Sequence, residues 1–442
     1  MKLTSSLIFA STLCVITLLS SQPVAAKDDT KKAHKSYSAS KKVPAMRNRV
    51  YAQLARAQAL ADEGNKQAGF QVLDQVKERL NSLNSYERAM LFNFYGFMHY
   101  ANEELSSAIS SFKLVVAEQS IPDSLITSTL YSLAQLSMQQ KDYTAALDFL
   151  HQWQQVNAKE LSPSQAMFFA QVYYQDKLFV DALMYIENAI VLAANKDKKP
   201  KENWLILKRA THYELNQPKQ VTKVMEQLVR WYDKPQYWLQ LSAMYGEVGE
   251  ENKQMAVMEA ALQAGYVTKS SDIITLSQLY LFHGAPFKSA HLLAEAIAQG
   301  TVVAQEKSLD LLARAYLAAK EDFKAIKVFK ELSNIVDDGQ YDAMLAQTYL
   351  NNEHWQEAIN YAGSAIKKSK TVNTNSANYL ANMYLAQGIA NFNLNNFQPS
   401  LTAFAQATAF VKVKKTAQQW RKYVEREQKN YQQLQVRLAM LN

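Results

Sequence analysis

The sequence contains a single cysteine, Cys14, among its 442 residues. This residue lies in an N-terminal segment that we expect to be removed on export, so the mature chain would hold no thiol. Such a chain forms no disulfide, binds no zinc through thiolates and performs no cysteine chemistry. Thiol-dependent enzymes and disulfide-stapled scaffolds are therefore excluded by composition.

Helix breakers are also scarce, with 11 glycines and nine prolines. The glycines are isolated, so the chain has neither a glycine-rich phosphate loop nor a Gly-x-Ser-x-Gly elbow. The prolines fall between periodic apolar segments or in a first helical turn, where the missing N–H costs nothing. Together with an apolar content of 48%, this pattern predicts an all-α protein of helices joined by short turns.

The sequence shows no spacing of histidines or acidic residues that is typical of a catalytic or metal-binding site. None of the seven histidines is spaced one helical turn from another beside a glutamate, as a metallopeptidase helix requires. The acidic pairs Glu250-Glu251 and Asp337-Asp338 fall in expected turns, where carboxylates are solvated rather than paired for glycoside hydrolysis. We expect no enzymatic activity, no cofactor and no metal.

The first 26 residues have the features of a signal peptide. Lys2 precedes an apolar run from Leu7 to Leu19, and Val24-Ala25-Ala26 supplies the small residues that a signal peptidase reads. The run is shorter than the roughly 20 residues needed to span a bilayer, and a bulky Leu13 before Cys14 disfavours a lipoprotein signal. We predict cleavage after Ala26, a mature chain without a transmembrane segment, and location in the periplasm of a Gram-negative bacterium.

The main feature of the remaining chain is a small residue followed twelve positions later by an alanine. This spacing recurs at intervals of 33 to 40 residues, the period of tetratricopeptide repeats (TPRs). Small residues let two antiparallel helices approach closely at their crossing point. The pairs are Gly96 with Ala108, Ala134 with Ala146, Ala170 with Ala182, Ala313 with Ala325, and Ala346 with Ala358.

This repeat predicts an α-solenoid of about ten TPR-like hairpins over residues 45–410. In the first, degenerate pair we place Ala55 at the small position, and we expect the fifth pair to be the weakest because Gln217-Pro218 interrupts its spacing. Ser242 faces a crossing at Gln254, and Ser277 faces Ala290, displaced by one. The expected pairs span residues 47–83, 86–119, 123–157, 162–195, 202–232, 235–264, 270–299, 305–335, 339–369 and 376–410.

Charge is concentrated at the two ends of the chain. The net charge is +8, yet residues 27–42 carry +4 and residues 411–442 carry eight basic against two acidic residues. The repeat region, residues 43–410, is slightly acidic, which disfavours nucleic-acid binding because that function requires a continuous positive surface. We expect residues 27–44 to form a flexible basic linker, and the basic ends suit weak contact with a membrane or the cell wall.

Residues 411–442 should form a basic amphipathic capping helix. Trp420, Val424, Glu427, Tyr431, Leu434, Leu438 and Leu441 follow steps of four and three along it. The expected role is to cover the last hairpin. The alternative is a coiled-coil contact with a partner or with a second copy of the chain.

The concave groove of such a solenoid is lined by the first helix of each pair. Counting from the small residue places an amide-rich and aromatic set in the groove, which suits an extended peptide or a partner helix. The clustered Lys, Asn and Arg of a chaperone-tail carboxylate clamp are not found. The expected groove contacts are Met167, Gln171, Tyr174, Gln175, Asp310, Arg314, Gln347 and Asn351.

Three stretches of this sequence are not repeat consensus and carry a family resemblance: NFYGFMHYANEELSSAI from Asn93, LSPSQAMFFAQVYYQDKLFVDAL from Leu161, and WLQLSAMYGEVGE from Trp238. Over residues 45–442 the chain resembles periplasmic TPR proteins encoded with TonB energy-transducing systems. The resemblance implies an accessory role in TonB-dependent import of iron-siderophores, with TonB-complex components as protein partners. It implies no catalytic residues.

The expected function is therefore that of a non-enzymatic periplasmic adaptor. A general envelope scaffold for secretion or cell-wall assembly differs from it only in the partner. A cell-wall lytic enzyme is the third alternative, and it is disfavoured because the chain ends about 32 residues after the last repeat.

Overall fold

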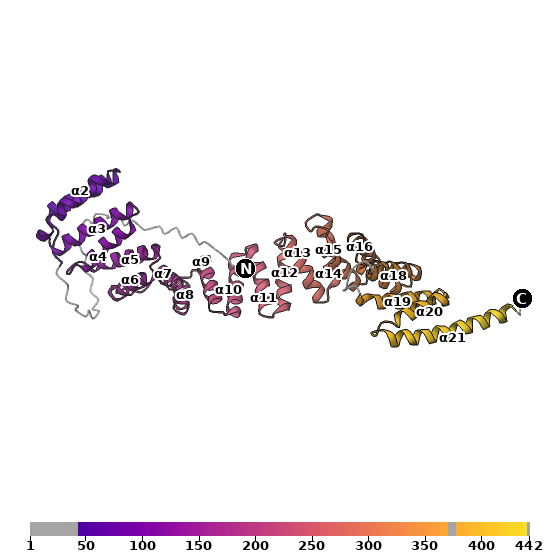
Figure 1. Ribbon diagram of the computed structural model, residues 1–442. Coiled ribbons are helices and arrows are strands. Elements are labelled where there is room, and N and C mark those ends of the chain that lie inside the picture. Colours follow the sequence, from indigo (N-terminus) through magenta and orange to yellow (C-terminus); the bar gives the residue numbers. More distant parts are fainter. Residues whose placement is uncertain (1–42, 370–376, 440–442) are drawn as a thin grey trace. The chain divides into compact units, whose positions relative to one another are not determined.

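The computed structural model describes residues 43–369 and 377–439 (Figure 1). The expected signal peptide, its cleavage site at Ala26 and residues 27–42 of the expected linker lie outside this range. Every regular element in the described residues is a helix, which confirms the all-α prediction. No described helix has both the length and the apolar character required to cross a membrane.

The chain divides into two compact units, and the boundary after Leu136 falls within helix α5. The first unit contains α1 (Asn48–Asp62), α2 (Lys66–Lys77), the 3-10 turn η1 (Leu80–Ser82), α3 (Ser85–Ala101), α4 (Leu105–Ala117) and most of α5 (Asp123–Gln139). The second contains α6 (Tyr143–Val156), α7 (Pro163–Gln175), α8 (Phe179–Ala194), α9 (Glu202–Glu214), α10 (Pro218–Tyr232), α11 (Pro235–Glu247), α12 (Glu251–Gln263), α13 (Ser270–Phe282), α14 (Pro286–Ala298), α15 (Glu306–Ala318), α16 (Asp322–Ile335), α17 (Gln340–Asn351), α18 (Trp355–Ser369), α19 (Ala377–Asn393), α20 (Phe397–Ala407) and α21 (Lys414–Ala439).

Local sequence explains where several helices begin. Asn84 and Glu87 form a capping box at α3, and Ser162 and Gln165 form another at α7, each satisfying backbone donors of the first turn. Proline is the first residue of four helices, where its fixed φ favours the helix. One of these is Pro218, so Gln217-Pro218 begins α10 and does not interrupt the fifth hairpin.

Each odd-numbered helix up to α19 is joined to the next helix by the same tight turn. One residue in each of these turns has a positive φ, and it lies seven positions after the small residue of the preceding helix. The left-handed region costs about 1–2 kcal/mol for residues other than glycine, yet seven of the ten turn residues in the described chain are not glycine. They are Gly64, Glu103, Lys141, Lys177, Asn216, Gly249, Gly284, Lys320, Glu353 and Asn395.

The small residues lie where the helices of a pair approach most closely. A Cβ atom on Gly96 would lie 2.5 Å from Cε1 of Phe112, and one on Gly388 would lie 2.6 Å from Cε1 of Phe404. In both pairs the phenylalanine of the second helix therefore covers a glycine of the first. The nine alanines at the predicted spacing are all fully buried, namely Ala108, Ala134, Ala146, Ala170, Ala182, Ala313, Ala325, Ala346 and Ala358.

Serine replaces the small apolar residue in three pairs without changing the spacing. Ser289 lies twelve residues after Ser277 and its Oγ donates to the Ser277 carbonyl at 2.7 Å. Ser400 donates to the Gly388 carbonyl at 2.7 Å, and Ser242 donates to the Gln254 carbonyl at 3.0 Å. The contact between Ser289 and the Ser277 carbonyl places this crossing at Ser289, so the prediction of Ala290 was wrong. The Ser277 hydroxyl is itself buried and has no hydrogen-bond partner in the described part of the chain.

The first hairpin was also assigned incorrectly. Ala57 is fully buried, whereas the predicted Ala55 is exposed. Gly69 lies twelve positions after Ala57, and a Cβ on it would lie 2.8 Å from the Ala57 carbonyl oxygen. Because several alanines occur in α1, composition alone did not identify the face that packs on α2; the turn at Gly64, seven positions after Ala57, identifies it.

The fifth hairpin carries an arginine at the position of the small residue. Arg209 lies seven positions before the turn residue Asn216, and its Nη1 donates to Oε1 of Gln240 on α11 at 2.6 Å. Burial lowers the pKa of its guanidinium from the ordinary value. Arg209 thus reaches out of its own hairpin to the next one instead of filling the crossing point.

Tyrosines three positions after the small residue connect one hairpin to the previous one. The Tyr245 hydroxyl donates to Oε1 of Glu226 on α10 at 2.7 Å, and the Tyr173 hydroxyl lies 2.8 Å from Nε2 of His151 on α6. Burial raises the pKa of Tyr173 to about 12, with Tyr185 and Asp181 contributing. These rings fill volume while their hydroxyls remain hydrogen bonded.

Within the second unit the helices form two rows. Successive odd-numbered helices contact one another, as in α7 with α9, α13 with α15 and α17 with α19. Each even-numbered helix from α6 to α18 contacts the odd-numbered helix that follows it. This arrangement is an α-solenoid of helical hairpins. The side of the odd-numbered row that faces away from the even-numbered row corresponds to the groove of a TPR solenoid.

Helix α21 covers the last hairpin with its first half. The Trp420 ring stacks on Phe404 with centroids 5.6 Å apart, and Val424 is fully buried, as expected of a cap. The second half differs, because Leu434 and Leu438 are 53% and 46% exposed. The apolar stripe therefore continues beyond the surface that it caps.

Candidate functional site

The candidate site is the surface of the odd-numbered helices in the second unit, which we term the odd-helix face. Its side chains come from α7, α9, α13, α15 and α17, within five positions of the residue at which each helix crosses its partner. They are mostly amides and aromatic rings. The face is defined by Gln171, Tyr174, Gln175, Tyr213, Glu214, Gln278, Phe282, Asp310, Arg314, Gln347 and Asn351.

On α7, three of the four predicted groove residues reach the surface. Gln171, Tyr174 and Gln175 are each half-buried. The Tyr174 ring packs edge-on against Phe179 at 5.5 Å, and burial raises its pKa, with a further contribution from Glu214 on α9. Met167 is only 3% exposed, because α7 packs against both α8 and α9. Its side chain is enclosed by these helices, so the prediction that Met167 contacts a partner was wrong.

The α15 part of the face is charged and internally paired. Nε of Arg314 lies 2.7 Å from Oδ2 of Asp310, one turn earlier. The hydrogen bond to Asp310 raises the pKa of Arg314 despite partial burial. Oδ1 of Asp310 is buried and accepts no hydrogen bond among the described residues. Arg314 remains half exposed, so it can still bind an acceptor on a partner.

Tyr341 borders this pair from the start of α17. Its hydroxyl lies 3.3 Å from Oε1 of Glu306. Burial raises the pKa of Tyr341 to about 12, and the nearby Asp310 and Glu306 carboxylates contribute. The phenol is therefore neutral over the physiological range and acts as a hydrogen-bond donor.

Gln347 and Asn351 extend the face along α17. Both are exposed, and Nε2 of Gln347 donates to Oδ1 of Asn351 at 2.8 Å. Each amide keeps further donor and acceptor atoms that this bond does not use. A peptide backbone presents alternating N–H and C=O groups, and such amides can bind both kinds of group.

Two large aromatic side chains on the face were not among the predicted residues. Tyr213 on α9 is 68% exposed and Phe282 on α13 is 71% exposed. Both lie near the end of an odd-numbered helix, just before its turn residue. Counting back from the turn residue would have identified them, whereas counting from the alanine pair failed because α9 and α13 have no alanine at the small position.

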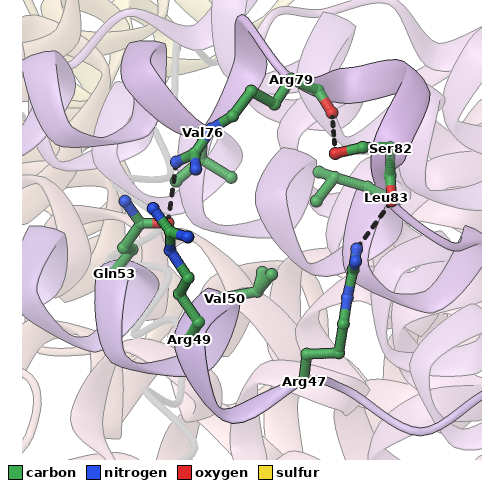
Figure 2. Close-up of a pocket in the computed structure, with 8 residues that line it drawn as sticks. All are labelled: Arg47, Arg49, Val50, Gln53, Val76, Arg79, Ser82 and Leu83. Carbon is green, nitrogen blue, oxygen red and sulfur yellow. Dashed lines mark hydrogen bonds between the residues drawn. The ribbon is translucent and has the colours of Figure 1, made fainter.

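A separate cavity of about 180 Å³ lies in the first unit (Figure 2). It is bounded by the start of α1, the end of α2 and the segment from Arg79 to Leu83 that contains η1. Val50, Val76 and Leu83 are buried and supply its apolar side. Its polar side is formed by Arg47, Arg49, Gln53, Arg79 and Ser82.

Arg47 is already engaged at this cavity. Its Nη2 lies 2.6 Å from Oε2 of Glu87, and it also donates to the Ser82 carbonyl at 2.7 Å. Glu87 is fully buried and accepts hydrogen bonds from the backbone N–H groups of Arg47 and Asn84 as well. The bond from Arg47 is the largest cause that lowers the pKa of Glu87 to about 2.

Among the described residues, no group of three or more His, Asp and Glu side chains lies close enough together to hold a metal ion.

No protein-family model matches the sequence, and no curated protein matches it significantly. Solved structures with a similar arrangement of helices include a tetratricopeptide repeat protein from Parabacteroides merdae, at 13% identity and a TM-score of 0.34 over 60% of this chain and 98% of that one. The MamA protein is similar at 13% identity and a TM-score of 0.33, over 40% and 91% of the two chains. The TPR2AB domain of yeast Sti1 in a complex with pHSP90 is similar at 14% identity and a TM-score of 0.26, over 60% of this chain and 98% of that one.

Proposed function

We propose that this protein is a non-enzymatic scaffold whose odd-helix face binds an extended segment or a helix of a partner protein. The observation that carries the proposal is the set of accessible amides and aromatic rings on α7, α9, α13 and α17, together with the half-exposed Arg314 on α15. Side-chain amides bind a peptide backbone by hydrogen bonds, and exposed rings bind apolar side chains. Tyr213 and Phe282 would be the energetic anchors, because truncating such aromatic contacts costs most at interfaces.

We further propose that the scaffold works in the periplasm as an accessory to TonB-dependent iron-siderophore uptake. The signal-peptide features of residues 1–26 support export, and the family resemblance supports the TonB system. The alternative proposal, a general envelope scaffold, is supported by the same binding face and differs in its partner.

The binding face is tested by site-specific photocrosslinking in living cells. A benzophenone amino acid placed at Gln347 or Gln278 should crosslink a partner, whereas the same group at Lys327, exposed on the even-numbered helix α16, should not. Equal crosslinking at all three positions, or none at the first two, would overturn the assignment of the face. Mass spectrometry of the specific adduct then decides the partner: a TonB-complex component supports the accessory role, and another envelope protein supports the general scaffold.

The location and the role in uptake have their own tests. N-terminal sequencing of the protein from the periplasmic fraction should begin at Lys27, and recovery of an uncleaved chain in the cytoplasm would contradict export.

Deletion of the gene should slow growth on iron-siderophore but not on freely soluble iron. Equal growth of the deletion strain and its parent on both sources would remove the proposed link to TonB.

A further inference from the structure

The arginines of the cavity in Figure 2 differ in how their charge is balanced. Arg47 is paired with the buried Glu87, as described above. Arg49 and Arg79 have no carboxylate partner within the described residues. Arg79 donates from Nη2 to Oε1 of Gln53 at 3.1 Å and from Nε to the Gln75 carbonyl at 3.4 Å.

The bond to Gln53 fixes the Arg79 guanidinium at the cavity, and Arg49 lines the same cavity. Figure 2 shows Arg49, from α1, and Arg79, from the segment after α2, among the side chains that line this cavity, with the hydrogen bond from Arg79 to Gln53 dashed. Like charges held at one place repel each other, and an anion placed between them removes that repulsion. The first turn of α1 contains no acidic residue that could serve as this anion.

The charge count indicates which anion fits. Arg47, Arg49 and Arg79 together with Glu87 leave two uncompensated positive charges at the cavity. Glu78 is adjacent to Arg79 in sequence but does not line the cavity. A phosphate monoester carries close to two negative charges at neutral pH, whereas a carboxylate carries one. Guanidinium groups also bind phosphate oxygens through two parallel hydrogen bonds.

The size of the cavity indicates how much of a ligand it holds. A volume of about 180 Å³ is below the roughly 300–1,000 Å³ of pockets that enclose a whole small molecule. The cavity thus holds a head group, with the rest of the ligand outside. The buried Val50, Val76 and Leu83 side chains give the cavity an apolar side that suits the first carbons of an ester.

We propose that this cavity is a binding site for the phosphate group of a phosphate monoester, with Arg49 and Arg79 as its ligands and the Arg47–Glu87 pair as one fixed wall. The site does not involve the odd-helix face, so its failure would leave the proposed function untouched. The phosphate could belong to a soluble organophosphate or to a lipid head group, and the two sources are separated below.

The test is isothermal titration calorimetry of the purified full chain at constant ionic strength. Glycerol 3-phosphate should bind saturably, and acetate should bind at least tenfold more weakly. The double variant Arg49→Gln/Arg79→Gln should lose at least tenfold in affinity, while Arg56→Gln, an exposed arginine on α1 outside the cavity, should bind as the wild type does. The lysine double variant should fall between them, because it keeps the charge and loses the forked geometry.

A soluble ligand and a lipid are distinguished by vesicles that contain phosphatidic acid. If the site takes a lipid head group, the wild-type chain should float with these vesicles and the glutamine double variant should not. If both chains float equally and only glycerol 3-phosphate distinguishes them, the ligand is soluble. Absence of saturable binding to either probe, equal binding of acetate, or an unchanged affinity in the double variant would each overturn the proposal. Unchanged thermal melting of the double variant excludes unfolding as the reason for a loss.

Discussion

At the scale of single residues, the close approach of paired helices depends on the absence of a side chain. Gly96 and Gly388 are each covered by a phenylalanine ring sixteen positions later, and neither site has room for a methyl group. The same function is performed elsewhere by alanine and by serine, and the hydroxyls of Ser242, Ser289 and Ser400 donate to a carbonyl of the paired helix. These positions therefore tolerate a change of residue only within a narrow range of volume.

Replacement of Gly96 by alanine should destabilise the protein by about 1–3 kcal/mol, because the added methyl group forces the Phe112 ring to move. Gly363→Ala is the matched control, since a Cβ at that site would make an ordinary contact of 3.4 Å with Gln387. There the higher helix propensity of alanine should be neutral or stabilising by up to about 1 kcal/mol. Denaturant unfolding measures both variants, and equal midpoints for the two would contradict the packing described for Gly96.

At the turns with a positive φ, introducing glycine should stabilise the protein and removing it should destabilise the protein. Lys320 has a φ of 61° between α15 and α16, a conformation that glycine adopts without steric cost. Lys320→Gly should therefore stabilise the protein by up to about 1 kcal/mol. Gly284→Ala, at the equivalent turn with a φ of 73°, should destabilise it by a similar amount. If both variants shift the melting temperature in the same direction, the backbone conformation assigned to these turns is incorrect.

At the scale of the secondary-structure elements, a buried carboxylate joins the starts of two helices. Glu87 caps its own helix α3 and accepts hydrogen bonds from Arg47 at the start of α1. Its pKa is lowered from 4.5 to about 2 in the folded state. Its contribution to stability is therefore complete above pH 4.5 and is lost as the pH falls from there towards 2.

Glu87→Gln should consequently lower the free energy of unfolding at pH 7 by about 1–3 kcal/mol and flatten its dependence on pH between 4.5 and 2. Glu331→Gln, at an exposed glutamate on α16, should leave both unchanged. Urea unfolding at several pH values makes the comparison. A wild-type curve with the same slope as that of the glutamine variant in this pH window would show that Glu87 is not held in its charged form.

The elements were more predictable than the details of their contacts. Apolar periodicity and the twelve-residue spacing indicate helical hairpins because these signals repeat along the whole chain. The assignment failed at Ala55 and Ala290, where a neighbouring residue of similar size offered the same signal and only the turn position distinguishes the two. The candidate face was predicted in part, since Gln347, Asn351 and Arg314 are exposed while Met167 is enclosed by neighbouring helices.

The cavity at the first hairpin had no signal in the sequence. Arg49 and Arg79 are 30 positions apart, on segments that neither spacing nor motif connects. Their proximity depends on how α2 and η1 return the chain to the start of α1. Local patterns carry no information on such a return, and three-dimensional packing is required to find it.

At the scale of the whole molecule, each hairpin of a solenoid is stabilised mainly by its immediate neighbours. A defect in one pair should therefore remain local within the second unit. Ala358 is fully buried in α18, and Ala358→Phe should overpack its interface by about 1–3 kcal/mol.

Hydrogen exchange measured by mass spectrometry should detect this effect. Amides of α17 and α18 should exchange faster in Ala358→Phe, while those of α7 and α8 should keep their wild-type protection. Uniform loss of protection over all these helices would indicate that the unit unfolds as one cooperative block. Ala358→Gly would be a second variant, with a cavity in place of an added ring, and should affect the same two helices.

The regular recurrence of the hairpin along the chain also indicates how the molecule could change in length. Residues 306–339 form a complete unit of 34 residues, from the start of α15 to the residue before α17, and they begin and end at equivalent points of the repeat. A tandem duplication of the DNA that encodes them would add one hairpin whose two flanking surfaces already match. Evolution or a designer could lengthen the partner-binding row in this way without remodelling either end of the protein.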